Sequence, residues 1–129
     1  MKNNLKHTTM ALVGLFVVHY IFSQLDLYWI YKWLDNVMHF TAGAIISLFI
    51  LRCFEIRKVV GWSLDGSIRR VSMVLVVAII ALAWEYFERR LGLAKPFDGT
   101  LYDTQMDVWT TICGSFVGYS YIYFKFKKR

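Results

Sequence analysis

The distribution of apolar residues constrains this chain more than any other feature. These residues gather in four long stretches, each close to the roughly 20 residues that a helix needs to cross a membrane. We expect helices over about residues 8–25, 34–51, 71–88 and 105–124. With 57% hydrophobic residues in a chain of 129, too little polar surface remains to cover a soluble globule of this size. The sequence therefore predicts an all-α integral membrane bundle that forms a single polytopic domain over residues 1–129.

The flanks of the first two stretches carry signals typical of membrane proteins. Lys2 and Lys6 precede the first stretch, and no small-residue cleavage site follows it, which favours a retained helix over a removed signal peptide. Tyrosine and tryptophan crowd residues 27–33, as they do at a membrane interface. His19 lies about a turn and a half before the end of the first helix, where a neighbouring helix is its most common partner.

Basic residues are unevenly divided between the two ends of the predicted helices. Eleven of the 15 lie at the termini or between residues 52 and 70, which we interpret as a basic surface loop. The exceptions are Lys32, Arg89, Arg90 and Lys95. The positive-inside rule places the richer side in the cytoplasm, so we expect four spans with cytoplasmic N and C termini. The net charge of +6 does not indicate nucleic acid, because no basic stripe is interleaved with polar surface.

Acidic residues converge on the opposite, outer ends of three helices. The pairs are Asp35 with His39, Glu85 with Glu88, and Asp103 with Asp107. The members of a pair are three or four residues apart, so they share one helix face within about 6 Å of axial rise. A charged group facing acyl chains costs several kcal/mol, so the pairs should turn inward and face one another. Carboxylates gathered in this way require protons, basic partners or a cation.

Small residues continue the same helix faces below the acids. Gly43 and Ser47 follow Asp35 and His39 at successive steps of four, and Gly114 lies below Asp107 on the last helix. Small side chains let membrane helices approach closely. We therefore expect these faces to pack against each other.

An oxygen-rich cluster with one imidazole suits a divalent cation, with Mg²⁺, Mn²⁺ or Zn²⁺ as the expected cofactor and Fe²⁺ also compatible. The predicted metal ligands, which would also be the catalytic residues of an enzyme, are Asp35, His39, Glu85, Glu88, Asp103 and Asp107. The predicted substrate-binding residues are Arg89, Arg90, Lys95 and Gln105.

Helix capping is a simpler explanation for some of these acids. Asp35 and Asp103 lie near predicted helix N-termini, where a carboxylate can cap free N–H groups and the helix dipole favours negative charge. Glu85 and Glu88 do not fit this explanation, because they end a helix, where the dipole disfavours them. An ion pair from Glu85 to Arg89 would still leave Glu88 unexplained.

Three motifs also resemble a known family. They are Asp35-Asn36-Val37-Met38-His39-Phe40-Thr41-Ala42-Gly43, then Trp84-Glu85-Tyr86-Phe87-Glu88, then Tyr102-Asp103-Thr104-Gln105-Met106-Asp107 followed by Gly114. In order and spacing they resemble the YjdF-like bacterial inner-membrane proteins and, more distantly, the VanZ-like proteins associated with glycopeptide resistance. The resemblance implies a polar site formed by the acids, His39 and Gln105 in a multi-pass protein of the bacterial inner (cytoplasmic) membrane. It implies no particular reaction.

Three classes of function are compatible with such a site. A metal-dependent hydrolase or transferase would hold a cation that polarises a phosphoryl oxygen or activates water. A transporter would use the same acids to relay protons or cations. The third class is a structural or ligand-binding membrane protein without catalysis. We favour a cation-assisted site near the extracytoplasmic face that binds or processes an anionic lipid or lipid-linked head group. Membrane lipids are then the expected partners, and the sequence is also compatible with a homo-oligomer.

Overall fold

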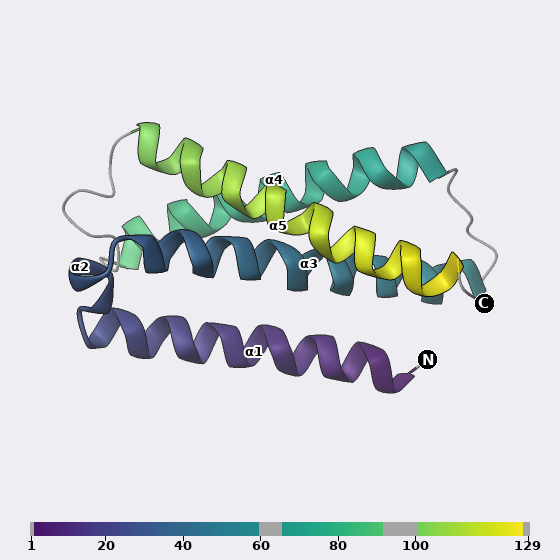
Figure 1. Ribbon diagram of the computed structural model, residues 1–129, viewed down its shortest axis with the longest axis horizontal. Helices are drawn as coiled ribbons and strands as arrows, with labels where there is room; N and C mark the ends of the chain where they lie inside the picture. Colours follow the sequence, from purple (N-terminus) through teal and green to yellow (C-terminus); the bar gives the residue numbers. More distant parts are fainter. Residues whose placement is uncertain (1, 60–65, 92–100, 128–129) are drawn as a thin grey trace.

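Four long helices and one short helix make up the described part of the chain in the computed structural model, which covers residues 2–59, 66–91 and 101–127. They are α1 (Lys2–Gln24), α2 (Leu27–Ile30), α3 (Trp33–Val59), α4 (Gly66–Leu91) and α5 (Leu101–Lys127). The long helices run side by side, with the start of α1 and the end of α5 at one end of the bundle and α2 at the other (Figure 1). No strand occurs in these described ranges, so the predicted all-α class is confirmed.

The helices extend beyond the predicted stretches. α3 continues to Val59 and α4 begins at Gly66, so much of the predicted surface loop at residues 52–70 is helical. Arg52, assigned to that loop, is buried with an exposed fraction of 7%. Charged residues end the membrane-compatible part of a sequence, but Arg, Lys and Glu are good helix formers, so a helix continues past them. Residues 60–65 of this loop lie outside the described part of the chain.

Within the described residues, three helices are long and apolar enough to cross a membrane, over Leu5–Gln24, Trp33–Cys53 and Arg70–Leu91. α5 has 27 residues, as many as α3, yet it is not among these candidate spans. Its many polar residues, Asp103 and Asp107 included, lower its hydropathy. Large apolar side chains are exposed on all four long helices, among them Val13, Leu75 and Phe116, as is expected of surfaces that face lipid.

The closest helix pair is α3 with α5, and glycines hold it together. A Cβ atom added to Gly43 would meet the backbone carbonyl of Thr111, and one added to Gly114 would meet that of Phe40. Gly118, four residues after Gly114, lies against Ala44 in the same way. Only residues without a side chain allow backbones to approach so closely. The predicted packing of these small-residue faces is confirmed.

The third partner of this pair is α4. Leu51, Met73, Val77 and Ile122, from α3, α4 and α5, form a buried apolar cluster toward the end of the bundle where the chain termini lie. This cluster fixes α4 against α3 and α5, and it leaves the other ends of the three helices to carry polar side chains.

Candidate metal centre

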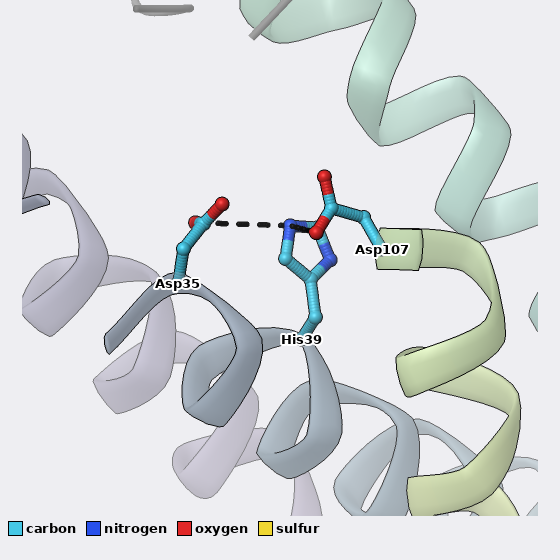
Figure 2. A group of neighbouring side chains, drawn as sticks. All are labelled: Asp35, His39 and Asp107. Atoms are coloured by element: carbon cyan, nitrogen blue, oxygen red, sulfur yellow. Dashed lines mark ion pairs between the residues drawn. The ribbon is translucent and has the colours of Figure 1, made fainter. Parts of the chain in front are cut away.

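His39 lies among three carboxylates, from α3, α4 and α5. Its Nε2 atom is 3.9 Å from Oδ1 of Asp35, 3.6 Å from Oε1 of Glu85 and 3.8 Å from Oδ1 of Asp107. Figure 2 shows the side chains of Asp35 and His39, from α3, and of Asp107, from α5, pointing toward one another. His39, Glu85 and Asp107 are all buried.

The spacing of residues along two helices explains this convergence. Asp35 and His39 occupy successive turns of the α3 face that continues to Gly43, and Asp107 and Thr111 occupy successive turns of the facing side of α5. The contact between Gly43 and the backbone of Thr111 sets these faces close together. The packing of Gly43, one turn deeper in the bundle, determines the distance between α3 and α5. Asp107 lies opposite His39 as a result.

Thr111 determines which nitrogen of His39 carries hydrogen. Its hydroxyl donates to the backbone carbonyl of Asp107 at 2.7 Å, so the hydroxyl has only lone pairs left for the imidazole. Nδ1 of His39 lies 3.3 Å from that oxygen, which favours the tautomer in which Nδ1 donates to it. In the neutral ring this leaves a lone pair on Nε2, the atom that faces the carboxylates. Metal-binding histidines are commonly fixed in this way by a hydrogen bond on the other ring nitrogen.

Glu85 contributes an unsatisfied oxygen to the cluster. Its Oε1 atom is buried and has no hydrogen-bond partner, while Oε2 lies 3.8 Å from the Arg89 guanidinium. A buried polar atom without a partner costs about 1–3 kcal/mol, and more if it is charged. Oε1 also lies 3.6 Å from His39 Nε2, so the oxygen that has no hydrogen-bond partner and the imidazole face the same small space.

The separations between these donor atoms are close to those of a metal site. Atoms held about 2.1 Å from a tetrahedral ion lie about 3.4 Å apart. The distances of 3.6–3.9 Å around Nε2 exceed this by only a few tenths of an ångström. The donor atoms of Asp35, His39 and Asp107 all lie within 4.8 Å of one another. Small side-chain movements would let these three residues hold a cation, and Glu85, which is not among the three, adds a carboxylate oxygen 3.6 Å from His39 Nε2.

A second polar group connects α1, α2 and α4. Nε2 of His19 lies 2.7 Å from Oε1 of Glu88, and Nδ1 lies 2.8 Å from the hydroxyl of Tyr28. The ring of Trp84 packs edge-on against His19 at 5.2 Å. Burial raises the pKa of the Tyr28 phenol, and the negative charges of Asp35 and Glu88 raise it further.

The remaining predicted site residues do not join the group around His39. Glu88 was predicted as a ligand beside Glu85, but it pairs with His19 instead. Asp103 is partly buried one turn before Asp107 and is not among the grouped donor atoms, and Gln105 is exposed. Of the predicted substrate-binding residues, Arg89 bonds to the hydroxyl of Thr104, and Arg90 to that of Tyr86. Lys95 lies outside the described residues.

Sequence reasoning missed two residues that complete these groups, Thr111 and Tyr28. Thr111 follows Asp107 by four residues, as His39 follows Asp35, so helical spacing could have indicated it. Tyr28 is one of several aromatic residues at the predicted interface, and nothing in the sequence distinguishes it from its neighbours. For His19 the sequence predicts a partner on a neighbouring helix, and this is confirmed: it pairs with Glu88 on α4 and also contacts the hydroxyl of Tyr28.

The fold and the site define an all-helical membrane protein with an imidazole and carboxylates buried between its helices. The chain belongs to the family described as "Predicted membrane protein (DUF2238)", whose sequence model matches residues 2–128. This membership is compatible with the resemblance to YjdF-like proteins, and the more distant resemblance to VanZ-like proteins stays a prediction. No curated protein and no solved structure matches the chain.

Proposed function

We propose that this protein binds a divalent cation through Asp35, His39, Glu85 and Asp107, and that the cation holds the anionic head group of a lipid or lipid-linked molecule. The buried Oε1 of Glu85, which has no hydrogen-bond partner, is the observation that carries the proposal. A cation would satisfy this oxygen and would also accept the Nε2 lone pair that Thr111 directs toward it.

The donor set favours some cations over others. Three carboxylates suit hard ions such as Mg²⁺ and Mn²⁺, whereas an imidazole suits Zn²⁺ and Fe²⁺. Mg²⁺ also requires near-ideal octahedral geometry and keeps several of its waters. A buried site with an imidazole ligand therefore suits it poorly. We therefore expect Mn²⁺ or Zn²⁺ to bind more tightly than Mg²⁺.

Arg89 supports the assignment of an anionic ligand. Its side chain is 44% exposed while its guanidinium lies 3.8 Å from Glu85, so it connects the buried cluster to the surface of the bundle. A phosphate oxygen on the cation and a guanidinium beside it are a common arrangement for holding a phosphorylated group. Whether the head group is only bound or also hydrolysed or transferred depends on a nucleophile, for which activated water is the simplest source.

We also propose that α5 is a fourth span and that the cluster faces the outside of a bacterial inner membrane. α5 packs along α3, from Gly114 against Phe40 to Gly118 against Ala44, and α3 contains a candidate span. A helix in contact with a span over this length shares its depth in the bilayer. The excess of basic residues at the other end supports a cytoplasmic location for both termini.

Translocation through the bundle is less well supported. Below the cluster, the hydroxyls of Ser47 and Ser115 are fully buried and donate to carbonyls of their own helices. The backbones at Gly43 and Gly114 meet the opposite helix directly, which leaves no space for a file of water between α3 and α5. The hydroxyls along this interface are therefore better explained by packing than by a proton path.

Thermal unfolding in detergent tests the metal site. A cation that binds only the folded protein raises the melting temperature with its concentration, by an amount equivalent to about 2.7 kcal/mol at 100 times Kd. We expect Mn²⁺ and Zn²⁺ to produce this shift in metal-stripped protein. Asp107→Asn and Glu85→Gln should abolish it, since each removes a charged ligand.

Two variants serve as matched controls. Glu88→Gln removes a carboxylate one turn from Glu85, but Glu88 pairs with His19, so the metal-dependent shift should persist. Glu55→Gln changes a position 16 residues beyond His39 on α3, about 24 Å along the helix, and should also have no effect on the shift. The proposal is wrong if the unmodified protein shows no shift, or if Glu88→Gln abolishes the shift as completely as Asp107→Asn.

A further inference from the structure

A cavity of about 190 Å³ lies between α1, α3 and α4 and connects the two histidine groups. His19, His39 and Thr111 are its polar lining residues, and the rest of its wall is apolar, including Leu12 and Ile46. For comparison, an apolar cavity of about 150 Å³ is large enough to hold a benzene molecule.

The cavity has a polar end and an apolar end. Leu12 precedes His19 by seven residues on α1, and Ile46 follows His39 by seven residues on the antiparallel α3. Seven residues correspond to about 10 Å of helix rise. On each helix the apolar wall therefore extends about 10 Å from the histidine toward the middle of the bundle.

The wall between α1 and α4 is made by side chains. In the described part of the chain, α1 packs on α2 and α3, and it reaches α4 through aromatic and ionic contacts. Phe16 packs edge-on against Trp84 at 5.9 Å, and His19 contacts both Trp84 and Glu88. Phe16, His19 and Trp84 also line the cavity, which is already partly open at the surface of the bundle.

We infer that this cavity receives one hydrocarbon chain of a phosphate-bearing lipid whose head group lies at the His39 cluster. The inference rests on the proposed function and names the ligand class of the same site. The polarity of the cavity matches such a molecule, because its apolar wall lies among candidate spans and its polar end includes His39, the residue around which the carboxylates gather. A water-soluble phosphate compound has no group to fill the apolar end.

Fluorescence quenching of Trp84 tests the inference, because bromine atoms on a lipid chain quench an indole that they touch. Replacing Trp29, Trp33, Trp62 and Trp109 by phenylalanine leaves Trp84 as the only tryptophan of the five. The probe is phosphatidic acid with brominated acyl chains, added in small amounts to the protein in dodecyl maltoside micelles with Mn²⁺. We expect saturable quenching that unbrominated phosphatidic acid reverses.

A second single-tryptophan protein provides the control. Trp109 on α5 is 64% exposed. In a protein that keeps Trp109 as its only tryptophan, quenching should be weak and should rise linearly with the lipid fraction. Equal, non-saturable quenching of Trp84 and Trp109 would overturn the inference. Competition identifies the chain: stronger reversal by a polyprenyl phosphate than by phosphatidic acid assigns an isoprenoid chain, and the opposite order assigns an acyl chain.

Filling the cavity provides an independent measurement. Ala81 lines the cavity, whereas Ala83, two residues further along α4, is exposed. Each methylene kept out of an apolar site weakens binding about fourfold. If the leucine of Ala81→Leu displaces two methylenes of the lipid chain, the lipid concentration at half-maximal quenching should rise about 15-fold. Ala83→Leu should leave it unchanged. If Ala81→Leu does not fold, Ala42→Leu fills the same cavity from α3. Unaltered quenching in the filled protein contradicts the inference.

The two proposals can fail separately. A metal-dependent melting shift without saturable quenching of Trp84 would leave the cation site in place and remove the lipid chain from the cavity. Saturable quenching that chelation does not weaken, in a protein without a metal-dependent shift, would retain the chain site and overturn the cation site.

Discussion

Thr111 tests whether the orientation of His39 matters for metal binding. Thr111→Val keeps the shape of the side chain but removes the oxygen that accepts from Nδ1 of His39. Loss of such an outer partner typically costs 10–100-fold in metal affinity, so the Mn²⁺ concentration at half-maximal melting shift should rise by about that factor. Thr111→Ser restores the hydroxyl and should recover most of the affinity.

The neighbouring residue supplies the control for this substitution. The hydroxyl of Thr110 also donates to the carbonyl four residues earlier, that of Met106, but no imidazole accompanies it. Thr110→Val therefore makes the same chemical change on the same helix and should leave the metal affinity unaltered. If both valine variants weaken binding equally, the effect comes from the helix and not from His39.

At the scale of the helix, sequence periodicity predicts some of the site and fails for the rest. Asp35, His39 and Asp107 could be predicted to face inward, because helical spacing places them above the glycines of their own helices. Glu85 and Glu88 are three residues apart, so they differ by about 60° around α4. This difference lets Glu85 face α3 while Glu88 faces α1. Which neighbour lies on which side of α4 is a property of the whole bundle, which no single helix encodes.

The glycines of the α3–α5 pair give a prediction at this scale. Gly114→Ala places a methyl group against the backbone carbonyl of Phe40, which cannot move aside without separating the helices. Overpacking of this kind costs about 1–3 kcal/mol. We expect a lower melting temperature in detergent and a weaker Mn²⁺-dependent shift, because Asp107 moves away from His39 when the helices separate.

Gly14 on α1 is the matched control. A Cβ atom at this position would have no neighbour within 4 Å. Gly14→Ala should therefore leave the melting temperature unchanged or raise it, since alanine is the better helix former. A Gly114→Ala protein as stable as Gly14→Ala would show that the two helices are not held at the distance described.

At the scale of the whole molecule, hydropathy predicts fewer spans than packing does. Three helices qualify as candidate spans by length and composition, and the polar residues that α5 turns toward α3 lower its own hydropathy. Thr111 and Ser115 are among these and are buried, so they would not face lipid. A count based on average hydropathy cannot distinguish polar residues that pack inward from polar residues that would meet acyl chains.

The number of spans determines the location of the C terminus, which a reporter fusion can detect. With four spans the C terminus lies on the same side as the N terminus; for a cytoplasmic N terminus, green fluorescent protein at the C terminus should fluoresce and alkaline phosphatase there should be inactive. Three spans would reverse both results if the N terminus stays cytoplasmic.

Cysteine labelling then fixes the orientation. In a protein without its native Cys53 and Cys113, Lys32→Cys should react with a membrane-impermeant maleimide added to intact cells, because Lys32 is exposed at the α2 end of the bundle. Lys6→Cys, at the other end of α1, should react only after the membrane is broken. The reverse pattern would place the His39 cluster on the cytoplasmic side, where the cation and the lipid head group would have to be reached from within the cell.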